Sequence, residues 1–210
     1  MAGVLEQLNA ALAEVCDRVC ASVVQVRDES RGAGAGTIWH AEGLIVTNAH
    51  VVHQGPLKVA LSDGRVLDAK LLARDEQHDL AALAVEASDL PTIELGSARR
   101  MHPGQWVMAL GHPWGVANAV TEGVLIGVGR QLPELPLASQ DWVVADLHLR
   151  PGNSGGPLVD AHGRLIGVNT LMNSPGVGVA VSVEAVKEFL RRTLGTTVAE
   201  AVAPAASEMV

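Results

Sequence analysis

The chain has no tyrosine, one phenylalanine and two cysteines among its 210 residues. So few cysteines exclude the disulfide framework that is typical of small secreted domains. Cys16 and Cys20 are four residues apart, and a disulfide across one helical turn has poor geometry. We therefore expect both thiols to pack as small apolar side chains. The eight histidines form no HxH, HxxxH or HExxH pattern, so we expect no metal site and no cofactor.

The sequence also lacks basic runs and long apolar runs. Its net charge is −8, and nucleic acids and anionic membrane surfaces attract patches of lysine and arginine, so we expect neither as a partner. No stretch of about 18 apolar residues predicts a membrane span. The N-terminal segment has no basic leader and is not typical of a signal peptide. The expected location is the cytoplasm if residue 1 is the native start, and the periplasm or another extracytoplasmic compartment if a leader was removed.

Two helices and many short strands are predicted. Apolar residues recur at helical spacing over residues 4–19 and 183–194, and Ser182 and Gly195 are a typical start and stop for the second helix. Between the helices, short runs of Val, Ile, Leu and Ala alternate with Gly, Pro, Asn and Asp. These runs predict an all-β fold of two six-stranded antiparallel barrels. The expected strands are 22–27, 35–39, 43–48, 57–61, 65–73, 80–85, 105–110, 119–129, 141–146, 157–160, 164–170 and 177–182.

The segment RPGNSGGPLVD, residues 150–160, places Ser154 among glycines and prolines. Glycine and proline together indicate a forced turn rather than a helix or a regular strand. In such a turn the backbone N–H groups of Gly152 and Ser154 can point at a developing oxyanion, with Asn153 between them. A serine hydroxyl becomes a strong nucleophile only when a base removes its proton, so the chain must also supply a base and an acid.

A base and an acid are found upstream of this turn. His50 lies in the apolar run LIVTNAHVV, and Asp79 opens the apolar strand in HDLAALAV. A carboxylate at the end of a buried strand needs a partner, and an imidazole N–H can supply one. The order His, Asp, Ser is that of the chymotrypsin arrangement, which occurs on an all-β fold.

Four blocks resemble the protease domain of the HtrA (Deg) serine proteases: GAGTIWHAEGLIVTNAHVV, HDLAALAV, ALGHPWGVANAVTEGVL and PGNSGGPLVDAHGRLIGVNT. The resemblance runs from about residue 21 to residue 193. It implies a chymotrypsin-like double barrel with His50 as general base and acid, Asp79 orienting it, and Ser154 as nucleophile. It also implies an oxyanion hole at Gly152, Asn153 and Ser154.

We expect this layout: an N-terminal helix (1–20), a protease domain (21–195) with barrels at about 21–100 and 101–182 and a helix at 183–194, and a flexible tail (196–210). Members of the family usually continue into PDZ domains, and we expect none in this sequence.

The same resemblance implies which residues bind substrate. The specificity pocket would be walled by the segment before Ser154, by 169–171 and by 177–181. His148 stands where trypsin-like enzymes keep the residue at the pocket floor, and since it is not an aspartate, Lys or Arg at P1 would gain no ion pair. We expect small or β-branched aliphatic P1 residues. The substrate-binding candidates are His148, Asn169, Thr170, Leu171, Val177 and Val179.

Three functions are compatible with these motifs. The first is a serine endopeptidase that cleaves unfolded or extended polypeptides, with a role in protein quality control. The second is a catalytically resting or inactive module of the same fold that binds extended chains. The third is an esterase, because the same triad attacks esters. The segment HLR at 148–150 replaces the small, neutral residues usual in the family, and no aromatic residue precedes Trp39. Resting activity and homo-oligomeric state are therefore left open.

Overall fold

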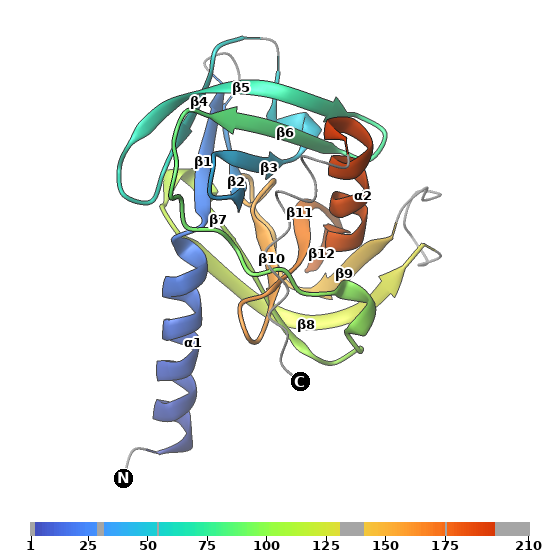
Figure 1. The fold of residues 1–210 in the computed structure, drawn as a ribbon. Coiled ribbons are helices and arrows are strands. Elements are labelled where there is room, and N and C mark those ends of the chain that lie inside the picture. The colour runs from blue at the N-terminus through green and yellow to red at the C-terminus, as the bar shows by residue number, and fades with distance from the viewer. Residues whose placement is uncertain (1–2, 29–31, 54, 131–140, 175, 196–210) are drawn as a thin grey trace, which may run out of the picture.

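Two closed six-stranded antiparallel barrels and two helices make up the protein, for which we analysed a computed structural model (Figure 1). The structure describes residues 3–28, 32–53, 55–130, 141–174 and 176–195. The predicted all-β, chymotrypsin-like double barrel with an N-terminal and a C-terminal helix is confirmed. The predicted flexible tail, 196–210, lies outside the described residues.

The first barrel closes in the order β1-β2-β3-β6-β5-β4. Its central strands β3 and β6 are almost entirely buried, whereas β5 alternates between exposed and half-buried residues. Runs of Val, Ile, Leu and Ala fill the inside of this barrel, and their burial stabilises it by the hydrophobic effect. The strands are β1 (Val23–Asp28), β2 (Gly32–His40), β3 (Leu44–Thr47), β4 (Leu57–Ala60), β5 (Val66–Asp75) and β6 (Leu80–Val85).

The second barrel closes in the order β10-β11-β12-β9-β8-β7. Every strand pair in both barrels is antiparallel, so short turns can join neighbouring strands. A core cluster that includes Val46 of the first barrel and Val168 of the second joins the two barrels. The strands are β7 (Trp106–Gly111), β8 (Ala119–Gly129), β9 (Trp142–Asp146), β10 (Pro157–Asp160), β11 (Leu165–Ser174) and β12 (Val177–Ser182).

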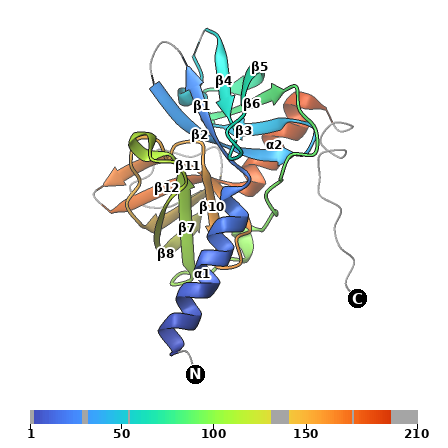
Figure 2. The same cartoon turned by 90° about the vertical axis from the view of Figure 1, so that its left-hand side faces the viewer.

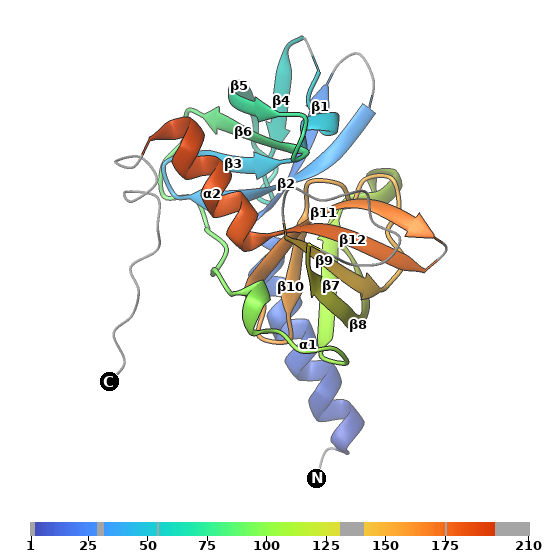
Figure 3. The same ribbon diagram turned by 90° about the vertical axis from the view of Figure 1, so that its right-hand side faces the viewer.

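Helix α2 (Val183–Leu194) follows β12 and runs back to the first barrel (Figure 3). The Ser182 hydroxyl accepts a hydrogen bond from the backbone N of Ala185 at 3.2 Å, which confirms Ser182 as the N-cap. Gly195, with φ of 82°, ends the helix as predicted. The buried side chains of Val186, Phe189 and Leu190 attach α2 to the core that joins the barrels.

Helix α1 (Val4–Cys20) lies beside β7 and β8 and extends beyond the barrels (Figure 2). Its C-terminal half packs on the core through Leu12, Val15 and Val19, while Val4 and Leu5 near its start are exposed. Both cysteines are free thiols in this helix and are partly buried against the same core, as predicted. Burial raises the pKa of Cys20 to about 11, so it is a poor nucleophile at neutral pH.

Neither a membrane-spanning helix nor a metal-binding cluster is found in the described part of the chain. None of the helices is long and apolar enough to cross a membrane. Within the same residues, no three His, Cys, Asp or Glu side chains gather as they would around a metal ion.

Candidate active site

His50 and Asp79 meet where two paired strands place them side by side. His50 lies in the short 3-10 helix η1 (Ala49–Val51) after β3, and Asp79 directly precedes β6. Since β3 and β6 are antiparallel neighbours, with Thr47 opposite Ala81, the end of one strand meets the start of the other. His50 Nδ1 is 2.8 Å from Oδ2 and 3.0 Å from Oδ1 of Asp79. An ionised carboxylate only accepts hydrogen bonds, so Nδ1 carries the proton and Nε2 is left as the basic nitrogen.

Three further contacts fix Asp79. The backbone N of His50 donates to Asp79 Oδ1 at 3.0 Å. The Thr170 hydroxyl of β11 donates to Asp79 Oδ2, from the second barrel. The side-chain amide of Asn48 donates to the Asp79 carbonyl at 2.9 Å. Asp79 itself has a φ of 52°, a left-handed conformation that is uncommon outside glycine. Its carboxylate is therefore held toward His50 by donors from both barrels.

The backbone before Ser154 turns its carbonyls outward. The Gly152 carbonyl accepts from the backbone N of His112 at 2.9 Å, and the Pro151 carbonyl accepts from the backbone N of Trp114 at 3.4 Å. In a trans peptide the N–H points opposite to the preceding C=O, so the Gly152 N–H faces the side of the loop away from Trp114. Gly152 and Ser154 line one cavity together with His50. The oxyanion hole expected at Gly152, Asn153 and Ser154 would open into this cavity.

Only glycine fits at positions 152 and 155. Gly152 has a φ of 105°, and a Cβ there would lie 2.7 Å from Pro113 Cα and closer still to the His112 carbonyl oxygen. Gly155 has a φ of 83°, and a Cβ there would overlap the Ala35 carbonyl oxygen and the Thr47 hydroxyl. Left-handed backbone and close approach together explain why glycines surround the serine. The Asn153 side chain is buried, and its Oδ1 accepts from the backbone N of Arg150 at 2.9 Å, which closes the turn.

Ser154 and His50 line one cavity of about 190 Å³ between the barrels, together with Gly34, Val51 and Gly152. In this structure the Ser154 hydroxyl donates to the Thr170 carbonyl at 3.0 Å. Among the described residues no hydrogen bond joins it to His50. Rotation about the Cα–Cβ bond of Ser154 would be needed to form one, and such bonds often tighten only when substrate is bound. A larger cavity of about 590 Å³ lies beside α2 and is lined by none of the predicted triad residues.

The six predicted substrate-binding residues are described in three pairs: Asn169 with Val179, Val177 with Leu171, and His148 with Thr170. Asn169 and Val179 are 1 % exposed, with the Asn169 amide donating to the Pro157 carbonyl and Val179 in the core. The side chains of these two residues are therefore not surface that a substrate can touch. Val177 is half-buried, and Leu171 pairs with Val179 through its backbone, while its side chain lies outside the described part.

His148 and Thr170 have different surroundings from those predicted. His148 is exposed, whereas its neighbours Leu147 and Leu149 are buried and lie against Gly178. Thr170 is 4 % exposed, and its hydroxyl is used on Asp79 instead of lining a pocket. The pocket-floor position predicted for His148 is thus flanked by leucine side chains. Thr170 contacts Asp79, the predicted acid of the triad.

Two residues at the 3-10 helix η3 (Pro113–Gly115), its N-cap His112 and Trp114 within it, also support the turn before Ser154. His112 is buried, and burial lowers its pKa, so its ring is neutral at neutral pH. Its Nδ1 accepts from the backbone N of Asn118 at 3.2 Å, and its backbone N holds the Gly152 carbonyl. Trp114 is 75 % exposed, with the Arg150 guanidinium 5.5 Å from its ring, a cation–π contact. Trp114 therefore lies against the loop that precedes Ser154.

The comparisons with known proteins agree with this arrangement. Residues 34–168 match the family model of the trypsin-like peptidase domain. The chain is 40% identical over 159 residues to the serine protease HhoB of Synechocystis sp., covering 73% of this chain and 38% of that protein. It is 41% identical over 164 residues to mitochondrial serine protease HTRA2 of Drosophila pseudoobscura pseudoobscura, covering 76% of this chain and 38% of that protein. The chain therefore spans well under half the length of these curated relatives.

Solved structures are similar over most of the chain. The HtrA-type protease AlgW with a decapeptide has a TM-score of 0.77 and 30% identity, over 86% of this chain and 66% of that one. AlgW with a tripeptide has a TM-score of 0.79 and 34% identity, over 86% and 62%. Fold, motif order and sequence match agree, and the chain belongs to the trypsin-like peptidase family, with HtrA-type serine proteases as its relatives.

Proposed function

We propose that this chain is a serine endopeptidase domain that cleaves extended polypeptides through His50, Asp79 and Ser154. The observation that carries the proposal is the shared cavity: Ser154, His50 and the Gly152 backbone line the same 190 Å³ space. The HtrA-type relatives solved with a tripeptide and a decapeptide support peptides as the substrate class. A role in the quality control of unfolded proteins follows from the similarity to HtrA-type proteases.

In the proposed reaction the Ser154 hydroxyl first turns from the Thr170 carbonyl toward His50. His50 Nε2 takes the Ser154 proton as Oγ attacks the scissile carbonyl carbon, and Asp79 stabilises the imidazolium that forms. The carbonyl oxygen becomes an oxyanion bound by the backbone N–H groups of Gly152 and Ser154. His50 then donates its proton to the leaving amine, which leaves an acyl-enzyme on Ser154. A water molecule, deprotonated by His50, releases the acid product and restores the serine.

Digestion of casein tests this function. Wild type should yield peptide fragments, and Ser154→Ala should lower the rate by about 10³-fold or more, because no nucleophile is left to form the acyl-enzyme. Ser62→Ala is the matched control, since Ser62 is exposed and donates only to the Ala21 carbonyl far from the cavity. The fragments are measured by mass spectrometry. Release of fragments at equal rates by wild type and Ser154→Ala would contradict the proposal.

Cleavage should follow small or aliphatic residues. Leu147 and Leu149 are buried against Gly178, beside the predicted pocket, and His148 between them carries no carboxylate. A P1 lysine or arginine would lose water there without gaining an ion pair. In a digest of a peptide library we expect new C-termini that are mostly Val, Ala, Ile or Leu. A strong preference for Lys or Arg would contradict this pocket.

A non-catalytic binding module is the second candidate. The Ser154 hydroxyl donates to the Thr170 carbonyl instead of to His50, as a resting or inactive site would show. Binding of unfolded casein with no cleavage by wild type, under conditions that keep the protein folded, would favour this candidate.

A further inference from the structure

The turn between β5 and β6 contains a second His–Asp pair next to Asp79. Asp75 Oδ1 accepts from the backbone N of His78 at 3.0 Å, and Asp75 Oδ2 lies 2.7 Å from His78 Nδ1. Arg192 of α2 donates to the same Oδ2. The Asp75 and His78 side chains are 13% and 18% exposed, so water screens this pair only weakly.

We propose that Asp75, His78 and Arg192 form a clamp that positions Asp79 toward His50. This inference rests on the proposed function, because it assigns the clamp to the triad acid. The three clamp residues lie outside the cavity of Ser154 and touch no reacting atom, so they are positioning residues. Asp79 is the residue that follows His78 directly, and the orientation of the His78 backbone is therefore passed to Asp79 across one peptide plane.

Asp79 needs support on both sides. Its φ of 52° is a left-handed conformation that residues other than glycine adopt only at an energetic cost. Such a conformation persists only where the surroundings hold it. Asn48, His50 and Thr170 hold Asp79 from the cavity side. The clamp holds the residues that lead into Asp79. Without the clamp, the turn between β5 and β6 can relax and swing the Asp79 carboxylate away from His50.

The charges favour a closed clamp at neutral pH. Burial raises the pKa of Asp75, but hydrogen bonds from the side chain and backbone of His78 and from the Arg192 guanidinium outweigh burial and hold that pKa below its ordinary value. An ionised Asp75 accepts from all three donors, and charge-assisted bonds of this kind are short and strong. His78 Nδ1 must then carry the proton of its ring.

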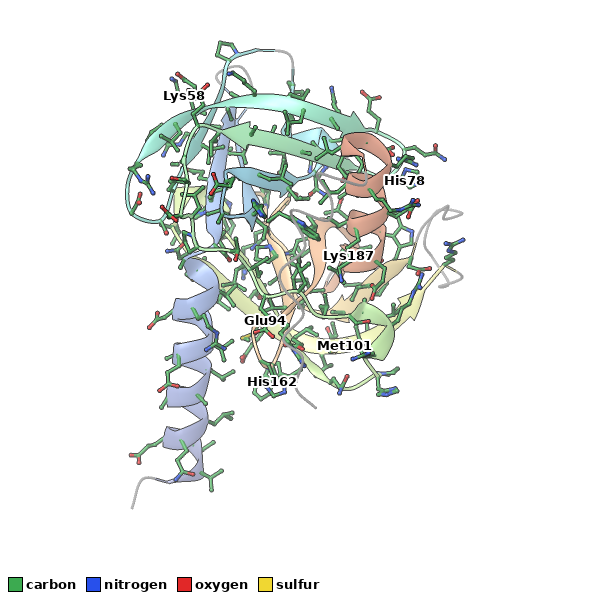
Figure 4. The ribbon with its side chains drawn as sticks, in the orientation of Figure 1. Lys58, His78, Glu94, Met101, His162 and Lys187 are labelled. Atoms are coloured by element: carbon green, nitrogen blue, oxygen red, sulfur yellow. The ribbon has the colours of Figure 1, made fainter. Side chains whose placement is uncertain are left out.

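Arg192 connects this turn to the second barrel. Helix α2 begins directly after β12, and its last turn lies beside the β5–β6 turn (Figures 1 and 3). Figure 4 shows His78 beside that end of the helix, with Lys187 nearer its start. The neighbouring Arg191 instead pairs within the helix, with Glu188. One arginine therefore links α2 to the clamp, and the adjacent arginine supplies a matched control.

The test measures kcat for His78→Ala, Arg192→Ala and Arg191→Ala. Each kcat is expressed per active site, and the number of active sites is titrated with a fluorophosphonate. We expect kcat to fall about 10- to 100-fold in the first two variants, with KM within about twofold, because a displaced triad loses rate more than binding. Arg191→Ala should retain wild-type kcat. His78→Asn should recover most of the loss, since its amide nitrogen can occupy the place of Nδ1 and donate to Asp75.

A merely structural role would give a different pattern. It would lower the melting temperature and the number of titratable sites but not the kcat of each site. Unchanged kcat per site in both His78→Ala and Arg192→Ala, or an equal loss in Arg191→Ala, would overturn the clamp while leaving the protease intact. Arg192 is half exposed, so its replacement keeps the test decisive even if His78→Ala does not fold. A wild type as inactive as Ser154→Ala would instead overturn the proposed function together with the clamp.

Discussion

Replacing Gly152 with alanine should lower kcat by about 100-fold or more, with KM and overall fold retained, because the change disturbs an oxyanion-hole donor. The new methyl group would meet the His112 carbonyl and Pro113 Cα, so the peptide between residues 151 and 152 must rotate or shift. Rotation moves the Gly152 N–H away from the cavity that it shares with Ser154. Steady-state kinetics on a peptide substrate, with circular dichroism to verify folding, would measure this effect.

Gly64→Ala is the matched control for that experiment. Gly64 also has a positive φ, 90°, but a Cβ there would touch nothing within 4 Å. It therefore carries the same type of backbone strain, at a cost of about 1–2 kcal/mol in stability, without touching the site. Full activity in Gly64→Ala and a large loss in Gly152→Ala would assign the effect to the oxyanion hole. Normal turnover by Gly152→Ala would show that the Gly152 N–H does not bind the oxyanion.

Asp79→Asn should lower kcat by about 10⁴-fold, the size of effect expected when the acid of such a triad is neutralised. The Asp79 carboxylate accepts from His50 N, His50 Nδ1 and the Thr170 hydroxyl. An asparagine has one acceptor oxygen and one NH₂ group, so at least one of these donors would face another donor. The imidazole would then turn or change tautomer, and Nε2 would no longer be the base.

Asp68→Asn is the corresponding control. Asp68 lies on the exposed face of β5 and pairs with Lys58, so the change removes one carboxylate from the same barrel without touching the triad. Single-turnover kinetics at neutral pH would compare the two variants. A loss of less than about tenfold in Asp79→Asn would mean that Asp79 does not orient the base.

Much of the fold follows from local sequence signals. Short runs of Val, Ile, Leu and Ala between turn residues predicted all twelve strands, because short apolar, β-branched runs bounded by Gly, Pro, Asn and Asp favour strands over helices. The boundaries were less accurate where pairing decides them. Strand β2 begins at Gly32 and not at residue 35, since its glycines pair with β1 although they have low strand propensity.

The candidate site could be predicted only in part. His50, Asp79 and Ser154 stand in distinctive sequence surroundings, and the resemblance assigned their roles. The contact of Thr170 with Asp79 joins residues 91 positions apart, and the contact of Arg192 with Asp75 joins residues 117 positions apart. Nothing in the local sequence of either residue indicates such a partner, because only the closure of the barrels and the packing of α2 bring them together.

The exposure of His148 has a similar explanation. Its neighbours Leu147 and Leu149 are buried in the core just after β9 ends, whereas His148 between them is exposed. The position that the resemblance implies for His148 does not show which of its neighbours the core takes up. Asn169 and Val179 have buried side chains, and their part in substrate binding stays a prediction.

The most direct test of the triad is covalent labelling with a fluorophosphonate, followed by mass spectrometry of the modified peptide. We expect one adduct, on Ser154, in the wild type, and labelling slowed by about 10³-fold or more in His50→Ala, because the reagent reacts only with a serine whose proton is removed by a base. An unlabelled wild type, or labelling that does not depend on His50, would contradict the claim that Ser154 is a nucleophile activated by His50.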